Sequence, residues 1–354
     1  MFVAMDKHRQ LVTLSSHQQA EGLRRKAFFC PACEAPVRVR NGAKVLAHFA
    51  HVGPACEAAS ENESAVHLAG KRWLQALGER LGYSVALETY YPAIKQRADV
   101  VWQSGKRTIV LEFQCSPLNA ERLLVRTAGY HRLGLDCIWI LGPKKQVKSL
   151  TNMRAQEQYW QVGHDGQLHL WFCDGYRHLE DWQWAHDRYH IHRFTVHGDA
   201  YRQQPFSSSD AEFARRLGNQ LLHREGRVMR LAQAAYQAHH VLGGVPWVVS
   251  QELTHLPGLK LPEWQLRTLW LLRFESQPLI TWAMSARFFA EYTTPLLTPL
   301  VNNAKLLARV GHAWETLLET RGFLARTAQG WQWQRELPWY QDLSAKLAAM
   351  GNGQ

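Results

Sequence analysis

The sequence RADVVWQSGKRTIVLEFQCSPL, residues 97–118, decides the fold. It contains two β-like runs, RADVVW and RTIVLEFQ, which are joined by the turn residues Gln103-Ser104-Gly105. A third run, SVALETYY, comes before them across Pro92, and the helical pattern NAERLLVRTAGYHRLG leads on to the apolar run CIWILG. A helix between two apolar strands predicts a crossover, and hence a mixed sheet that is covered by helices.

Two acidic residues, Asp99 and Glu112, interrupt these apolar runs, where an unpaired charge would be costly. Carboxylates from neighbouring strands can hold Mg²⁺ and still leave positions for water and a phosphate. Glu112 and Gln114 are two residues apart on one strand, so their side chains share a face. The pattern predicts a common metal pocket, and an ion pair with Arg97 or Arg107 is the alternative.

The sequence ENESAVHLAGKRWLQALGERLG, residues 61–82, predicts a helix before the strands, because its apolar residues recur at helical spacing. Glu63, His67 and Lys71 lie four residues apart and therefore share a face of this helix. Glu63 is our candidate for a third metal-binding carboxylate, and Glu61 is the alternative. A solvated helix face with one supporting ion pair is the other interpretation of the same spacing.

Arg122, Arg126 and Tyr130 also recur every four residues, on the helix that follows the third strand. Such a stripe can contact a DNA backbone or hold the scissile phosphate. The alternative is an ordinary charged outer face of a helix.

The first 58 residues are short strand-like runs, and so small a unit needs an additional stabilising element. Cys30 and Cys33 form a C-x2-C knuckle, and His51 and Cys56 follow at a distance that closes a loop. These four residues are our predicted ligands for a structural Zn²⁺, with His48 able to replace His51. The alternative is a buried cysteine pair among core or surface histidines.

Composition favours a polyanionic partner, because 41 Lys and Arg residues outnumber 30 Asp and Glu and leave a net charge of +11 over 354 residues. The start of the chain lacks a secretory pattern, and no stretch approaches the roughly 20 apolar residues of a membrane helix. We therefore expect a cytoplasmic protein without a membrane partner. Six cysteines over this length are too few for a disulfide scaffold.

Seven short stretches resemble the competence protein CoiA family, whose nuclease core belongs to the PD-(D/E)XK, or restriction-endonuclease-like, superfamily. In order along the chain they are MFVA, CPAC, HFAH, ENESAVHLAGK, ADVV, LEFQCSPL and RTAGY. The resemblance implies a zinc-binding N-terminal domain, a core of α-β-β-β-α-β character, and a part in processing DNA, single-stranded or branched, during natural transformation and recombination. A recombinase and other competence proteins are the implied partners.

By the same resemblance, Asp99 looks like the metal-binding aspartate of the family and Glu112 like its second carboxylate. Gln114 stands where the wider superfamily usually has a lysine, so it supplies hydrogen bonds but no charge to a developing phosphate anion. Lys71 is a candidate to replace that lysine from the preceding helix.

We thus expect an α+β protein with α/β character. Its predicted parts are a Zn-binding β-rich module at 1–58, a PD-(D/E)XK-like nuclease core at 59–145, a β-rich aromatic segment at 146–205 and a mainly helical C-terminal domain at 206–354. Within the last part, HAWETLLETRGFLARTAQGWQWQRE is compatible with a winged-helix element that turns at Ala328-Gln329-Gly330.

The leading functional hypothesis is an Mg²⁺- or Mn²⁺-dependent deoxyribonuclease. In it Glu63, Asp99 and Glu112 bind the metal, Gln114 positions the attacking water, and His67 and Lys71 belong to the site. Two alternatives remain: a non-catalytic mediator that binds single-stranded DNA and docks a recombinase, and a defence-type endonuclease with the same chemistry.

Overall fold

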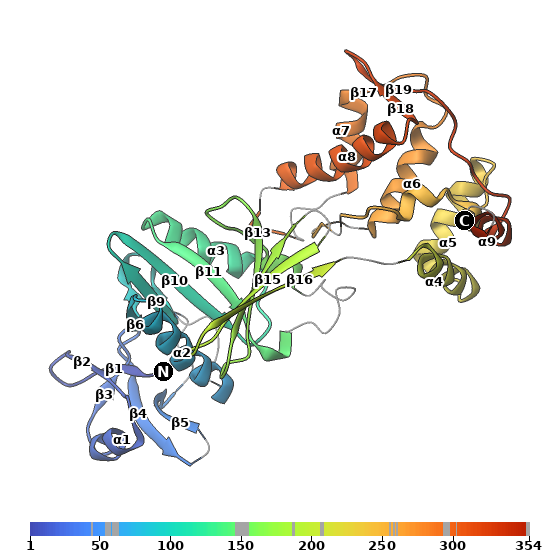
Figure 1. Ribbon diagram of the computed structural model, residues 1–354. Helices are drawn as coiled ribbons and strands as arrows, with labels where there is room; N and C mark the ends of the chain where they lie inside the picture. Colours follow the sequence, from blue (N-terminus) through green and yellow to red (C-terminus); the bar gives the residue numbers. More distant parts are fainter. Residues whose placement is uncertain are drawn as a thin grey trace. The chain divides into compact units, whose positions relative to one another are not determined.

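Figure 1 shows a computed structural model of the chain, coloured along the sequence. The residues it describes are 1–43, 45–53, 58, 64–145, 156–185, 188–205, 209–254, 256–257, 259, 261–292, 298–301 and 303–351. They form two compact units. The first consists of Met1–Gln183 and His190–Gln203, and the second of Trp184–Tyr189 and Gln204–Gln354.

The first unit begins with a small β-rich module. Its elements are β1 (Val3–Met5), β2 (Leu11–Thr13), α1 (His17–Leu23), β3 (Phe28–Phe29), β4 (Pro36–Gly42) and β5 (Val45–His51). The strands form one sheet in the order β2-β1-β3-β4-β5. Phe28 and Phe49 pack in its core, with ring centroids 4.8 Å apart. The predicted β-rich module is therefore present.

The core of the first unit has the predicted order of helix, three strands, helix and strand. These elements are α2 (Ala65–Arg80), β6 (Ser84–Leu87), β9 (Val100–Ser104), β10 (Arg107–Gln114), α3 (Ala120–Arg132) and β11 (Asp136–Leu141). β6, β9 and β10 pair antiparallel, whereas α3 carries the chain across so that β11 pairs parallel to β10. The mixed sheet with its crossover helix is confirmed.

The two helices use opposite faces of β10, because side chains alternate along a strand. Leu111 and Phe113 pack with the apolar residues of α2, and Val110 packs with Tyr130 of α3. At Gly70 of α2 an added Cβ would lie 2.0 Å from the Phe113 ring. Helix and sheet therefore approach closely where the candidate acidic residues lie.

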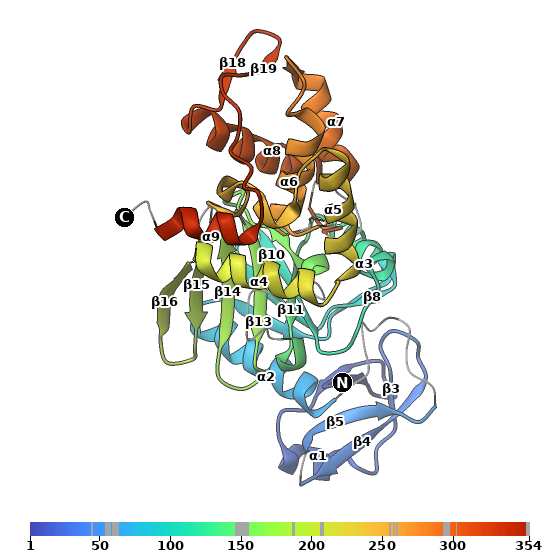
Figure 2. The same cartoon turned by 90° about the vertical axis from the view of Figure 1, so that its right-hand side faces the viewer.

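The sheet extends beyond the predicted core. Its further strands are β13 (Leu168–Cys173), β14 (Leu179–Trp184), β15 (Arg188–Phe194) and β16 (Asp199–Pro205), and they lie side by side with β11 in Figure 2. β13 pairs parallel to β11, with Ile140 opposite Trp171. The sequence placed residues 146–205 in a segment of their own, but in the structure the described strands of that segment continue the core sheet.

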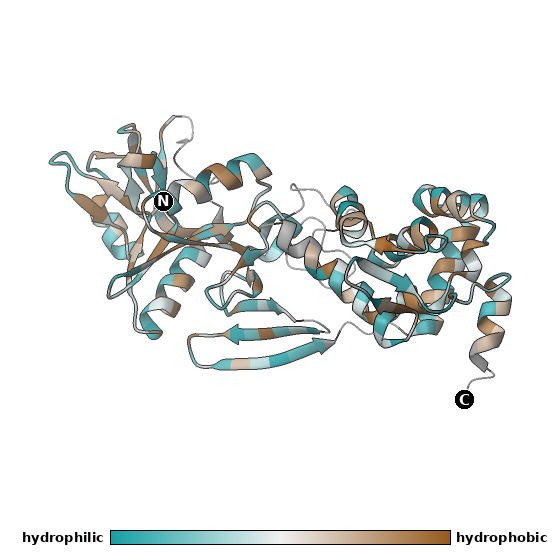
Figure 3. Ribbon diagram, turned by 90° about the horizontal axis from the view of Figure 1, so that it is seen from above, coloured by the Kyte–Doolittle hydropathy of each residue, from teal (hydrophilic) through white to brown (hydrophobic). Residues whose placement is uncertain are grey.

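Shorter elements complete the first unit. They are β7 (Tyr90–Tyr91), which pairs with β8 (Gln96–Arg97), and β12 (Gln161–Val162), which pairs with β13. Brown apolar segments alternate with teal polar ones along the helices and strands of both units in Figure 3, as expected for elements that bury one face.

The second unit is mainly helical, as predicted. Its helices are α4 (Asp210–Leu222), α5 (Gly226–Gln237), α6 (Glu263–Phe274), α7 (Trp282–Tyr292), α8 (Asn303–Thr320) and α9 (Leu343–Gly351). Three short strands, β17 (Ile280–Thr281), β18 (Leu324–Arg326) and β19 (Gly330–Trp333), form a sheet in the order β17-β19-β18. The order α6-β17-α7-α8-β18-β19 is that of a winged-helix element, and the predicted hairpin turn lies between β18 and β19. Among the described helices, none has the length and apolar character needed to span a bilayer.

Candidate functional site

Asp99 lies at a bend just before β9 and is almost fully buried. Its Oδ2 atom accepts a hydrogen bond from the backbone N–H of Phe113 at 3.0 Å and lies 3.1 Å from Nε2 of His67. His67 belongs to the first turn of α2, where Ser64 caps the helix. Asp99 is thus held between α2 and β10. His67 contacts it, as expected for a residue on the predicted site-facing side of the helix.

Glu112 stands next to Asp99 across the sheet, because the antiparallel pairing of β9 and β10 runs up to Leu111 and Val100. Its side chain is fully buried on the α3 face. Oε1 accepts hydrogen bonds from Nη2 of Arg126 and from the hydroxyl of Tyr130, both at 2.5 Å. Oε2 is buried and has no hydrogen-bond partner among the described residues.

Besides its contact with Glu112, Arg126 donates hydrogen bonds to two backbone carbonyl oxygens. Its Nη1 donates to the carbonyl oxygen of Ala58 at 2.9 Å, and its Nη2 donates to that of Arg97 at 3.0 Å. Among the described residues the cation paired with Glu112 is Arg126, and Arg107 pairs with Asp136 at 3.1 Å. The ion pair that the sequence left open exists, but its cation comes from α3.

Burial raises the pKa of Glu112, and the neighbouring charge of Asp99 acts in the same direction, while Arg126 and Tyr130 oppose both. Burial and the same carboxylate raise the pKa of Tyr130. For Arg126, burial acts to lower the pKa but Glu112 outweighs it and raises the pKa above its ordinary value. At neutral pH, Arg126 and Tyr130 therefore both remain proton donors to Glu112.

Gln114 lies on the same face of β10 as Glu112 and is also fully buried. Its Nε2 donates to the carbonyl oxygen of Ser116 at 2.9 Å and lies 3.3 Å from the Ser116 hydroxyl. Its Oε1 is buried and, like Oε2 of Glu112, lacks a hydrogen-bond partner in the described part of the chain. Buried oxygens of this kind are costly unless they bind an ion or water. Because Mg²⁺ prefers oxygen ligands, the residues fit a hard divalent cation.

Lys71 makes a fully buried ion pair with Glu88, with 2.6 Å between Nζ and Oε1. The other oxygen of Glu88 accepts the backbone N–H groups of Phe2 and Val3 at 2.6 and 3.0 Å. Lys71 is therefore tied to a contact that joins the core to the N-terminal strand. Our sequence reasoning missed Glu88, although it interrupts the apolar run SVALETYY just as Asp99 interrupts the next run.

The predicted polar face of α3 is corrected by the structure. Arg122 is exposed, but Arg126 and Tyr130 are 4% and 0% exposed and point to Glu112. These two side chains are internal partners of the acidic residue and not part of an outer surface that DNA could contact. Glu63 and its alternative Glu61 lie outside the described residues.

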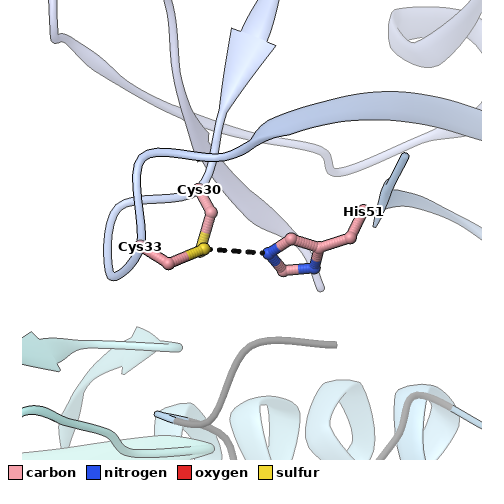
Figure 4. Close-up of side chains that lie close together, drawn as sticks. All are labelled: Cys30, Cys33 and His51. Atoms are coloured by element: carbon pink, nitrogen blue, oxygen red, sulfur yellow. Dashed lines mark hydrogen bonds between the residues drawn. The ribbon is translucent and has the colours of Figure 1, made fainter. Parts of the chain in front are cut away.

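Cys30, Cys33 and His51 come together in the N-terminal module (Figure 4). Their ligand atoms all lie within 4.8 Å of one another, and Sγ of Cys33 is 3.3 Å from Nε2 of His51. His48 lies on the other face of β5, since it is three residues from His51, and its Nδ1 is 2.8 Å from the carbonyl oxygen of Leu46. The structure thus favours His51 over His48. Cys56 lies outside the described residues.

This group can hold a metal such as zinc. A zinc ion binds thiolate at about 2.3 Å and imidazole at about 2.0–2.1 Å, so tetrahedral ligand atoms lie roughly 3.5–3.8 Å apart. The observed spacing needs a small adjustment of side chains to reach that value. Two thiols and one imidazole are soft and borderline ligands. Such a set binds zinc in preference to harder cations.

Comparison with known proteins matches two parts of the chain to domain families. The model of the competence protein CoiA nuclease-like domain matches residues 63–208, and that of the CoiA N-terminal domain matches residues 12–59. Together the two matches cover more than half of the chain. The chain belongs to the competence protein CoiA family. The predicted resemblance is thus confirmed, and the CoiA nuclease-like domain contains Asp99, Glu112 and the added strands β13 to β16.

The competence protein CoiA of Bacillus subtilis (strain 168) is 32% identical over 146 residues. That alignment covers 41% of the present chain and 39% of the Bacillus protein. No solved structure matches the chain. Residues 209–354, which make up most of the second unit, lie outside both CoiA domain models.

Proposed function

We propose that this CoiA-family chain is a metal-dependent deoxyribonuclease of the PD-(D/E)XK type, which acts in the cytoplasm during natural transformation and recombination. The observation that carries the proposal is the pair of buried oxygens, Oε2 of Glu112 and Oε1 of Gln114, that have no hydrogen-bond partner among the described residues. They lie on one face of β10, and Asp99 is the cross-strand neighbour of Glu112. This is an oxygen-rich, largely solvent-free site.

Asp99 and Glu112 would hold Mg²⁺ or Mn²⁺, which when bound would activate water and neutralise charge on a scissile phosphate. The protein fixes these ligands in advance. The N–H of Phe113 and the ring of His67 orient Asp99, while Arg126 and Tyr130 occupy one oxygen of Glu112 and leave the other for a ligand. His67, Arg126 and Tyr130 are therefore positioning residues.

Gln114 would orient the attacking water through Oε1, since Ser116 already holds its amide nitrogen. A neutral amide cannot stabilise a developing anion as lysine does, so we expect slower phosphodiester hydrolysis than in lysine-containing relatives of the superfamily. Glu63 remains our proposed third carboxylate.

In the N-terminal module we propose a structural Zn²⁺ bound by Cys30, Cys33 and His51, with Cys56 as the fourth ligand. Three ligands from one small module and a fourth a few residues further on would close the coordination shell. Zinc would then stabilise a sheet whose own apolar core is small.

A second candidate function is a non-catalytic mediator that binds single-stranded DNA and docks a recombinase. The 2.5 Å ion pair between Arg126 and Glu112 favours it, because a carboxylate that is neutralised internally has less charge to offer a metal. A defence-type endonuclease would share the chemistry of the first proposal, and only the biological substrate would separate the two.

The test uses the full-length protein with single-stranded, duplex and branched DNA in the presence of Mg²⁺, Mn²⁺ or EDTA. Asp99→Asn and Glu112→Gln should each lower the cleavage rate by about 100-fold or more, whereas Glu121→Gln, an exposed residue on α3, should retain it. Equal cleavage by all four proteins would reject the site. Metal-independent DNA binding without any cleavage would support the mediator.

A further inference from the structure

Helices α4 and α5 form a hairpin in the second unit, outside both CoiA domain models. They are joined by the three-residue turn His223-Arg224-Glu225, in which Arg224 adopts a positive φ of 50°. Each helix is amphipathic. Phe213, Ala214 and Leu217 of α4 and Val228, Leu231 and Ala235 of α5 are the buried residues. The opposite faces of the two helices are therefore open to solvent.

Five arginines lie on the exposed side of this hairpin. They are Arg215 and Arg216 on α4, Arg224 in the turn, and Arg227 and Arg230 on α5. Within the described part of the chain, none of the five has a carboxylate at ion-pair distance. Two of the three acidic residues of the hairpin are directed elsewhere: Asp210 accepts a hydrogen bond from Gln251, and Glu225 accepts one from Gln220. The third, Glu212, makes no ion pair with the hairpin arginines within the described residues.

Some other arginines of the second unit have partners within the protein. Arg267 makes a buried ion pair with Glu263 in the same unit, at 2.7 Å, and Arg321 pairs with Glu252 at 2.7 Å. On α8, the helix that corresponds to the recognition helix of a winged-helix element, Arg309 lies over the ring of Trp184. The α4–α5 hairpin thus combines five exposed arginines within sixteen residues of sequence, none of them paired with a carboxylate among the described residues.

We infer that the α4–α5 hairpin is a docking site for the sugar–phosphate backbone of DNA. The inference rests on the proposed function for its choice of DNA as the polyanion. At 1.5 Å of rise per residue, Arg215 and Arg230 lie within about 12 Å of the turn along their helices. Duplex DNA carries about one charge per 1.7 Å of its axis, so several arginines within that span can each meet a phosphate.

The residue types agree with this partner. The guanidinium group of arginine binds phosphate oxygens with two parallel hydrogen bonds, which lysine cannot do. On α5 the exposed residues beyond Arg230 are polar or aromatic: Gln233, Gln237 and Tyr236, the last 78% exposed. Amides can contact the backbone, and an exposed tyrosine ring can stack on an unpaired base.

The experiment measures DNA binding by the full-length protein in EDTA, where hydrolysis does not contribute. A fluorescent single strand and a duplex of the same sequence are titrated at several salt concentrations. The test variant combines Arg224→Gln, Arg227→Gln and Arg230→Gln. The control combines Arg273→Gln, Arg287→Gln and Arg326→Gln, three exposed arginines elsewhere in the same unit, and so removes the same net charge.

We expect the test variant to bind at least about 10-fold more weakly, with the slope of log affinity against log salt reduced by about 2–3, since each lost phosphate contact contributes about 0.7–0.9. The control should keep the slope of the native protein. The corresponding Arg→Lys triple variant should restore most of the slope, which separates loss of charge from loss of folding.

Equal effects of the test and control variants would overturn the inference, because net charge alone would then explain binding. An unchanged slope in the test variant, or no DNA binding by the native protein, would also overturn it. Asp99→Asn and Glu112→Gln are measured in parallel. These variants separate the two inferences. If they abolish cleavage but not binding, or if the native protein binds DNA without cleaving it, the docking site can be accepted or rejected independently of the nuclease activity.

Discussion

Arg126 and Glu112 form a buried ion pair between α3 and β10, with Nη2 and Oε1 2.5 Å apart and both side chains at most 5% exposed. The ion pair gives the two oxygens of the Glu112 carboxylate different surroundings. One oxygen is held by α3, and the other is directed into the protein without a hydrogen-bond partner among the described residues. The guanidinium of Arg126 and a metal ion from solution therefore compete for Glu112, and this competition decides whether Glu112 binds a metal.

Arg126→Gln should destabilise the protein by about 3–5 kcal/mol, because it leaves Glu112 buried beside Asp99 without a cation. The free energy of unfolding, measured in urea, checks this value. Arg132→Gln, at the exposed C-terminal end of the same helix, should change it by less than about 0.5 kcal/mol. Similar losses in both variants would mean that the ion pair has no special role.

His51→Gln should abolish stoichiometric zinc binding, whereas His48→Gln should retain it, since only His51 lies beside Cys30 and Cys33. Metal analysis of the purified proteins, with about one Zn²⁺ per chain in the native protein, gives the comparison. The loss should be accompanied by a lower Tm of the N-terminal module. Zinc retained in His51→Gln but lost in His48→Gln would reverse our assignment.

Lys71 and Glu88 should show strong energetic coupling, because both are fully buried and join the core to the N-terminal strand. Lys71→Met and Glu88→Gln should each destabilise the first unit by about 3–5 kcal/mol, and the double variant should lose clearly less than the sum. Urea denaturation of the four proteins completes the cycle. Additive losses would show that the two side chains act independently.

Lys346 on α9 is fully buried, lies over the rings of Trp247 and Phe213 at 4.0 and 4.9 Å, and its Nζ has no hydrogen-bond partner among the described residues. Burial lowers the pKa of Lys346 from 10.5 to about 7, although Asp210 opposes the change. The unfolded chain therefore binds more protons than the folded one between these two values. Stability should rise with pH across that interval as far as this group is concerned.

Lys346→Met should accordingly raise the Tm at neutral pH and remove this part of the pH dependence. A pKa difference of this size corresponds to a few kcal/mol, of which local opening of α9 would relieve a part. Thermal unfolding of both proteins between pH 6 and pH 10 measures the effect, covering the range about the pKa values of the two states. A lower Tm in Lys346→Met at every pH would show that the ammonium group stabilises the fold through its aromatic contacts.

Local sequence patterns predicted the order of the core elements, the proximity of Asp99 to Glu112 and the grouping of Cys30, Cys33 and His51. Alternation along RADVVW and RTIVLEFQ predicts adjacent strands, so Asp99 and Glu112 had to be neighbours once the hairpin at Gly105 formed. The C-x2-C knuckle and the histidines of β5 predict a metal centre for a similar reason, because a short turn brings its own ends together. In each case the distance along the chain is short, and the backbone geometry leaves few arrangements.

Tertiary structure decided which polar residues are buried and with whom. A stripe at four-residue spacing looks the same on an exposed helix face and on one that covers a carboxylate, so Arg126 and Tyr130 could be assigned only when α3 was seen on Glu112. Likewise, Glu88 meets Lys71 and the backbone N–H of Phe2, and Trp171 joins the strand of Ile140, across long separations in sequence. Such contacts depend on how whole elements pack, and the energy of a buried pair comes from desolvation that no local pattern encodes.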